Sequence, residues 1–315
     1  MLNLFKKSLP VTLFIFLFSI PGFTQSLSEK VLLEHLQFLA SDDLQGRKTL
    51  SEGNLKARTY IQDHFRKLEN TEIIYPNFLQ FFSFRNGRDG KIYNDAANVV
   101  AIIPGSESKK VIVITAHYDH VGVGRPNAEG DSIYNGADDN ASGTAALMAM
   151  IEYFSKNRPK HALLFVALDA EEMGLRGARA LLEDFPYSME QILLNVNMDM
   201  IGGNDQKELY ASGTHHYPYL KPILEKTVKG APIALKFGHD VPGTGSDDWT
   251  KSSDHGAFFE KKVPHVYFGV EDHEDYHKPS DYLTGIQPEF FVQAANLVLQ
   301  CIIALDTELL DSAKK

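Results

Sequence analysis

Three stretches between Ile112 and Glu172 decide the fold: IVITAHYDH (112–120), GADDNASG (136–143) and LLFVALDAEE (163–172). The first and third begin as unbroken apolar runs, which are typical of buried strands, and each ends in imidazole or carboxylate groups. The second stretch directly precedes a helical apolar pattern. An unpaired buried charge costs several kcal/mol, so groups of this kind at strand ends favour a metal ion as their common partner.

Similar apolar runs recur along the chain, and amphipathic helical patterns separate them. The expected strands are 78–84, 98–103, 111–115, 163–168, 192–196 and 265–270, and the expected helices are 27–40, 55–68, 141–155, 175–184, 217–229 and 290–305. Continuous apolar strands indicate a sheet that is covered on both faces. The predicted fold is therefore α/β, with a mixed, mostly parallel central sheet sandwiched by helices. Ligands in such folds bind beyond the carboxyl ends of the strands.

The first 25 residues differ from the rest of the sequence. Lys6 and Lys7 precede an apolar run over residues 8–20, and Pro21-Gly22 follows it. This pattern is typical of a secretory signal peptide, and the run is shorter than the ~20 residues that cross a bilayer as a helix. An uncleaved anchor is the alternative. We expect residues 1–25 to be a signal peptide, residues 26–315 to form a single catalytic domain, and the protein to be periplasmic or extracellular, with no stable membrane insertion after processing.

Composition excludes several classes of function. The formal net charge is −10 and no basic cluster dominates, whereas nucleic-acid binding usually requires a positive footprint. Cys301 is the only cysteine, so there is no intrachain disulfide and no structural cysteine zinc site; we expect a buried, small apolar residue there. Ser253-Asp254-His255 is not a serine-hydrolase triad, because three consecutive residues do not normally form one.

Two of the stretches carry candidate metal ligands with competing interpretations. His117 ends a strand and Asp119 follows two residues later, an arrangement in which the histidine binds metal and the aspartate orients its ring; a structural histidine is the alternative. His120 is the competing imidazole and ranks second. Asp138 and Asp139 precede a helix, where capping explains one aspartate but less easily two. One carboxylate has two oxygens and can bridge two cations about 3.5–4 Å apart.

The remaining candidates come from three further positions along the chain. Glu171 and Glu172 are either a charged first helical turn or a divided pair, in which one carboxylate binds metal and its neighbour takes a proton from water. Asp199 interrupts an apolar run and needs a partner if it is buried. His277 lies in a turn-rich loop. Two histidines with three or four carboxylates suit zinc, or cobalt or manganese where those metals are supplied instead.

Together these motifs resemble peptidase family M28, zinc-dependent exopeptidases that include secreted bacterial aminopeptidases. The resemblance runs from LQFLASDDLQGR (36–47) to YHKPSD (276–281) and covers nearly all of the chain after residue 25. It implies two zinc ions per chain. The implied roles are His117 and Asp199 on one zinc ion, Glu172 and His277 on the other, Asp138 as the bridge with a cis peptide after it, Glu171 as general base and acid, Tyr276 as a group steadying the oxyanion, and Asp119 and Asp281 as supporting residues.

The resemblance also implies a reaction. We expect hydrolysis of N-terminal residues from peptides by a metal-activated water, and a free N-terminal ammonium is favoured in a carboxylate-rich pocket. Two alternatives stay open: a glutaminyl-peptide cyclotransferase of the same fold, which typically works with one zinc ion, and a non-catalytic binding ectodomain. The complete set of candidate ligands, with both His117 and His277 present, favours two metal ions and therefore the peptidase.

Overall fold

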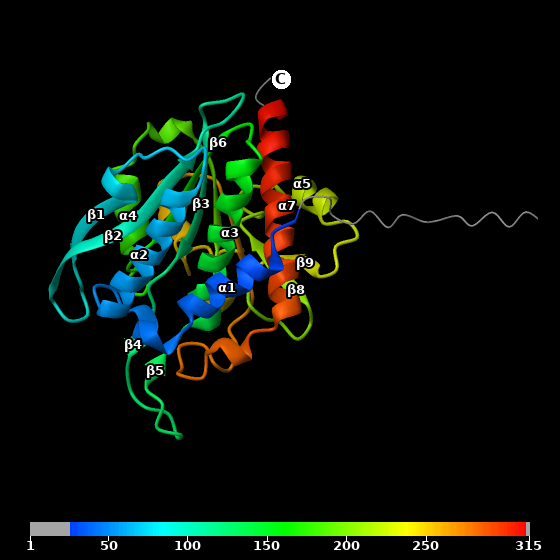
Figure 1. Cartoon of the computed structure of the whole chain (residues 1–315). Helices are drawn as coiled ribbons and strands as arrows, with labels where there is room; N and C mark the ends of the chain where they lie inside the picture. The colour runs from blue at the N-terminus through cyan, green and yellow to red at the C-terminus, as the bar shows by residue number, and fades with distance from the viewer. Residues whose placement is uncertain (1–25, 313–315) are drawn as a thin grey trace, which may run out of the picture.

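The computed structural model describes residues 26–312, so the predicted signal peptide lies outside the described residues. Eight strands form one central sheet in the order β1-β2-β6-β3-β7-β10-β8-β9 (Figure 1). Their bounds are Leu79–Arg85 (β1), Ile92–Ile103 (β2), Val111–His117 (β3), Ala162–Leu168 (β6), Ile192–Met198 (β7), Glu208–Ser212 (β8), Ala234–Phe237 (β9) and His265–Gly269 (β10). The inner strands β6, β3, β7 and β10 are parallel. Strands β2 and β8 join antiparallel to β6 and β10, and β1 joins antiparallel to β2. The predicted mixed α/β architecture is confirmed.

Helices cover both faces of this sheet. One face packs against α1 (Glu29–Leu39), α2 (Glu52–Lys67), α3 (Gly143–Lys156) and α7 (Pro288–Ser312), and the other packs against α4 (Arg176–Glu183) and α6 (His255–Glu260). Successive residues of a strand supply the two faces in turn: in β3, Ile112 and Ile114 join the first core, and Val111 and Val113 join the second. Since both faces are apolar, the strand pattern is continuous rather than alternating.

Helix α7 belongs to the first core. Within it, Pro288–Leu309 is long and apolar enough to cross a membrane, yet 61% of its most apolar window is buried inside the fold. Cys301 is fully buried in this helix, as expected. The helix is therefore apolar because it packs against the sheet and against α1 and α5 (Lys221–Thr227).

The structure differs from the expected elements on both sides of the sheet. Strand β2 begins at Ile92, where the sequence predicted a start at 98. Strands β8 and β9 were not predicted, because both are short and neither is a continuous apolar run. Helix α5 is shorter than the expected helix 217–229. A small ribbon, β4 (Gly122–Val123) with β5 (Ile133–Tyr134), lies outside the main sheet. None of these differences affects the inner strands β3, β6 and β7, which position the site.

Candidate metal centre

Three parallel strands end at the same edge of the sheet, and each delivers polar side chains there. Strand β3 ends at His117, β6 is followed by Asp169 to Glu172, and β7 is followed by Asp199. Because the strands are parallel and adjacent, their carboxyl ends meet, as expected for a ligand site in an α/β sheet. His277 reaches the same place from the loop after β10.

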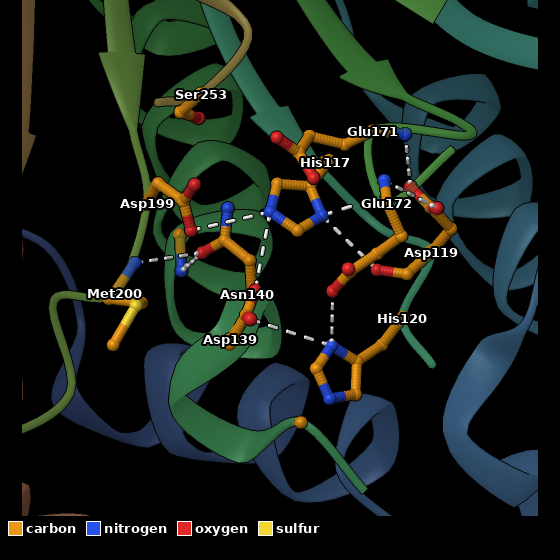
Figure 2. A network of polar contacts seen from close by, with 12 residues as sticks. His117, Asp119, His120, Asp139, Asn140, Glu171, Glu172, Asp199, Met200 and Ser253 are labelled. Carbon is orange, nitrogen blue, oxygen red and sulfur yellow. Dashed lines mark hydrogen bonds and ion pairs between the residues drawn. The ribbon is translucent and has the colours of Figure 1, made fainter. Parts of the chain in front are cut away.

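The ring of His117 is buried and fixed in orientation. Its Nδ1 lies 3.1 Å from the main-chain carbonyl oxygen of Asp119. That oxygen accepts only from a protonated Nδ1, which leaves Nε2 with a free lone pair. Nε2 lies 3.4 Å from Asp139 Oδ1 and 3.3 Å from Asp199 Oδ1 (Figure 2). The imidazole therefore presents its ligand atom to two carboxylates.

Asp139 stands at the centre of the site. Its Oδ1 faces His117, whereas its Oδ2 lies 3.1 Å from Nε2 of His277 and 3.7 Å from Nδ1 of His120. The side chain is 5% exposed. One carboxylate thus presents one oxygen to each of two separate groups of donors, which is the arrangement of a bridging ligand.

The prediction that Asp138 is this bridge is wrong, and so is the position of the cis peptide bond, which follows Asp139 and not Asp138. Asp138 points away from the donor groups: its Oδ1 accepts from the main-chain nitrogen of Gly202 at 2.6 Å and from Ser142 Oγ at 3.1 Å. Its Oδ2 lies 3.2 Å from His273 Nε2. Neighbouring residues of the loop face opposite sides, so only one of the two aspartates reaches the centre.

Two residues fix the loop that carries Asp139. Asp281 accepts hydrogen bonds from the main-chain nitrogens of Asp138 at 2.9 Å and Asp139 at 3.1 Å, so it acts on the loop backbone. Asn140 donates to the carbonyl oxygen of Met198 at 2.9 Å, which ties the loop to the end of β7. Burial raises the pKa of Asp281 to about 6, and the neighbouring Asp138 adds to the rise.

A second group of donors lies beside the first. Glu172 Oε1 is 3.3 Å from His277 Nε2 and 2.8 Å from His120 Nδ1. Together with Asp139 these residues form one set, and His117, Asp139 and Asp199 form the other. The structure therefore gathers four of the five predicted ligands, with Asp139 in place of Asp138, and it adds His120, which the sequence had ranked second.

Burial and the neighbouring charges shift the pKa values of the residues in this centre. Burial raises the pKa of Asp139, and the nearby Glu172 carboxylate raises it further. Burial also acts on Glu172, but its contacts with the imidazoles of His120 and His277 hold its pKa well below the usual range. Burial opposes the charge of His277, yet Asp139 and Glu172 raise its pKa to about 10. The site therefore favours positive charge between its carboxylates.

Glu171, the predicted general base, and its neighbours line a cavity beside the first donor set. Glu171 lines a cavity of about 140 Å³ together with His117, Asp199 and Tyr276. Burial raises the pKa of Glu171 well above its ordinary value. The ring of Tyr276 stacks on His277, with centroids 4.0 Å apart. These positions fit a proton-transfer group and an aromatic wall on one side of the cavity.

Asp119 has a wider role than predicted. Its main-chain carbonyl oxygen lies 3.1 Å from His117 Nδ1, and its carboxylate Oδ1 lies 3.8 Å from the same nitrogen. The carboxylate accepts from the main-chain nitrogens of Glu171 at 3.0 Å and Glu172 at 3.4 Å. It therefore fixes the turn on which both glutamates are placed.

The distances between donor atoms fit metal ions of the size of zinc. Zinc bonds to nitrogen and oxygen are about 2.0–2.1 Å, so the edges of a zinc tetrahedron are roughly 3.3–3.4 Å long. In the first set, His117 Nε2 lies 3.4 Å from Asp139 and 3.3 Å from Asp199. In the second set, His277 Nε2 lies 3.1 Å from Asp139 and 3.3 Å from Glu172. The mixed nitrogen and oxygen donors also suit zinc.

Ser253, Asp254 and His255 do not form a catalytic triad, as expected. Ser253 Oγ accepts from Asn197 Nδ2 at 2.9 Å, and His255 Nε2 contacts the carbonyl oxygen of Trp249 at 2.8 Å. Asp254 is fully buried, and burial raises its pKa to about 7. The segment begins α6 and packs behind the site.

Comparison with known proteins identifies the family. The model of "Peptidase family M28" matches residues 98–302, and the chain belongs to this family. Aminopeptidase YwaD of Bacillus subtilis is 28% identical over 204 residues, which are 61% of this chain and 40% of that protein. The chain spans less than half the length of this and other curated relatives that it matches.

Solved structures share the fold at low identity. The zinc aminopeptidase BSAP from Bacillus subtilis has a TM-score of 0.70 and 16% identity, covering 88% of this chain and 95% of that one. A glutaminyl cyclase from Bacteroides thetaiotaomicron, bound to N-acetylhistamine, has a TM-score of 0.71 and 16% identity, covering 88% and 98%. Because both kinds of enzyme have this fold, the donor atoms and not the fold must decide between them.

Proposed function

We propose that this member of peptidase family M28 is a zinc-dependent aminopeptidase that holds two zinc ions per chain. The observation that carries the proposal is the Asp139 carboxylate, whose two oxygens face two different donor sets. A site for one metal ion has no need of a carboxylate in this position. His117 and Asp199 would complete the first site, and Glu172 and His277 would take part in the second.

Each side chain then has a defined task. Zinc ions, when bound in these sets, supply Lewis-acid activation of water and of the scissile carbonyl. Glu171 takes the proton of the attacking water and returns it to the leaving amine. Its buried carboxyl group suits this exchange, because burial raises its pKa towards the working pH and the adjacent cations lower it again. Tyr276 lines the same cavity, and its task is to contact the substrate carbonyl.

The charge around the cavity supports a substrate with a free N-terminus. Asp272 lines the same cavity as Glu171 and Asp199, and its side chain is exposed. A substrate ammonium would lie among carboxylates, whereas a substrate carboxylate would be repelled. The proposed substrates are therefore peptides whose first residue carries an unmodified amino group.

One panel of substrates tests this function. It contains aminoacyl-nitroanilides, their N-acetylated counterparts and glutaminyl peptides, each with and without chelator. We expect release of nitroaniline from the free-amine substrates only, its loss with chelator and its return with zinc. Pyroglutamate formation without peptide hydrolysis would instead indicate a cyclase, and no turnover of any member would indicate a binding protein; either outcome contradicts the proposal.

The metal count and the location need their own measurements. Elemental analysis of the purified protein should give two zinc ions per chain, and a value of one after zinc addition would contradict the bridge. We also propose that the protein is exported, because Lys6 and Lys7 precede a short apolar run. Mass spectrometry of the exported protein should show an N-terminus near residue 26, and retention of the whole sequence in the cytoplasm would argue against export.

A further inference from the structure

His120 lies at the second donor set and is more confined than the other histidines there. Its ring is 1% exposed, whereas the side chain of His277 is 40% exposed. The ring packs against Gly136, where a Cβ atom would lie only 2.5 Å from His120 Cδ2. The main-chain nitrogen of His120 donates to the carbonyl oxygen of Arg47 at 3.4 Å. The imidazole is therefore held in one place, with Nδ1 towards the donor set (Figure 2).

The neighbours of this ring that the structure describes do not form hydrogen bonds with its two nitrogen atoms. Among the described residues, neither Nδ1 nor Nε2 makes a hydrogen bond of acceptable geometry, and Oε1 of Glu172 is likewise without one. Yet Nδ1 and this oxygen are only 2.8 Å apart. Both atoms belong to one group of four donor atoms that could hold a metal ion at a common point between them. Buried polar groups in proteins are rarely left without a partner.

The four donor atoms around that point are spaced as ligands of one metal ion. Nδ1 of His120 lies 2.8 Å from Glu172 Oε1 and 3.7 Å from Asp139 Oδ2. The other edges, from His277 Nε2 to the same two oxygens, are 3.3 Å and 3.1 Å. All four atoms lie within 4.8 Å of one another. These values scatter around the roughly 3.3–3.4 Å edge of a tetrahedron with zinc bonds of about 2.0–2.1 Å.

We infer that His120 is a direct ligand of the second metal ion, which then has four protein ligands, whereas the first has three. The inference rests on the proposed two-metal function. A site closed by four protein ligands resembles structural zinc sites, and a site with three keeps a position open. The open site is the one beside Glu171 and the cavity. The two ions then differ in retention: the second is held permanently, and the first exchanges.

The competing explanation is that His120 only orients the Glu172 carboxylate from outside the coordination sphere. Cobalt-substituted protein separates the two. In its proton NMR spectrum, an imidazole bound to Co²⁺ shows a strongly shifted N–H signal. With histidine-specific ¹⁵N labelling to assign these signals, we expect three shifted imidazoles in the unaltered protein and two in His120→Asn. Two in the unaltered protein would overturn the inference, whether or not the variant folds.

Stepwise removal of metal by a chelator gives the second measurement. In the unaltered protein we expect one ion to leave readily and one to be retained, and in His120→Asn we expect the retained ion to bind at least a hundredfold more weakly. His273→Asn is the matched control, since His273 contacts Asp138 and belongs to neither donor set. A loss of less than a hundredfold in His120→Asn, which is the range typical of outer partners, would contradict direct ligation. Neither readout needs turnover, so a failed substrate panel would overturn the aminopeptidase and leave this result interpretable.

Discussion

Replacing Asp139 by asparagine should remove metal from both donor sets, whereas the same change at Asp138 should remove it from neither. The two residues are adjacent and chemically identical, so each variant is the control for the other. Asp139 Oδ1 and Oδ2 face different sets, and an amide offers one oxygen and no charge in their place. Asp138 faces Gly202 and Ser142 instead.

The size of the effect follows from the burial of Asp139, which is 3% exposed. Removing one partner of a buried charge pair costs about 3–5 kcal/mol. Since 1.4 kcal/mol is a factor of ten, each metal dissociation constant should rise between about a hundredfold and a few thousandfold. For Asp138→Asn we expect no more than about tenfold, the lower end of what outer partners contribute, with a loss of roughly 1–2 kcal/mol in folding stability from the weakened hydrogen bonds.

The assay is competition with a chromophoric chelator, followed by elemental analysis after gel filtration. Circular dichroism checks that both variants fold. If Asp138→Asn released more metal than Asp139→Asn, the bridge would be misassigned. If Asp139→Asn released only one of two ions, the carboxylate would belong to one set and the two-metal interpretation would need another bridging group.

Three further outcomes are expected. Glu171→Gln should keep both metal ions but lose about 10²–10⁴-fold in kcat; unchanged turnover would remove Glu171 as the base. Burial lowers the pKa of His265 to about 2, so the folded protein keeps this imidazole neutral while the unfolded chain can protonate it. The stability that this difference leaves intact above the unfolded pKa of about 6.5 is lost as the pH falls below it. From pH 7 to 5 this loss is about 2 kcal/mol, and denaturant unfolding of His265→Leu should show that much less pH dependence. Arg47→Met should cost roughly 3–4 kcal/mol in denaturant unfolding, because it removes the guanidinium hydrogen bonds to four carbonyl oxygens, at about 1 kcal/mol each; a loss under 1 kcal/mol would refute this role.

The sequence predicted the parts of the site that depend on strand ends. Buried parallel strands have a strong apolar pattern, and the residue after each run lies at the carboxyl edge of the sheet. This rule placed His117, the Glu171-Glu172 pair and Asp199 correctly relative to one another. It missed β8 and the edge strand β9, because both are short and lack the continuous apolar run of the inner strands.

The errors at the site lie in loops, where periodicity gives no direction. Asp138 and Asp139 have the same composition signal, and only the backbone path through Asn140 decides which one faces inward. His120 follows the end of β3, so the alternation of a strand no longer says where its ring points. One signal was available: two imidazoles three residues apart, after a buried strand, are more than a single metal ion needs from that segment.

The cost of gathering these carboxylates ties the fold to its cations. Asp119, Asp139 and Glu171 are buried close together, and burial raises the pKa of each. A chain selected for stability alone would replace such a cluster by apolar side chains, since buried charges rarely exceed well-packed hydrophobic groups in stabilisation. Asp119 accepts main-chain hydrogen bonds from the glutamate turn, and Asp281 accepts them from the Asp139 loop. Asp119 and Asp281 therefore hold the backbone in place. In this position, the donor oxygens of the neighbouring acids lie about as far from the imidazole nitrogens as two ligands of one zinc ion lie from each other. We therefore expect the donor atoms to be in position before any ion binds. An ion that binds only the folded chain should stabilise it by about 2.7 kcal/mol per site at a hundred times its dissociation constant.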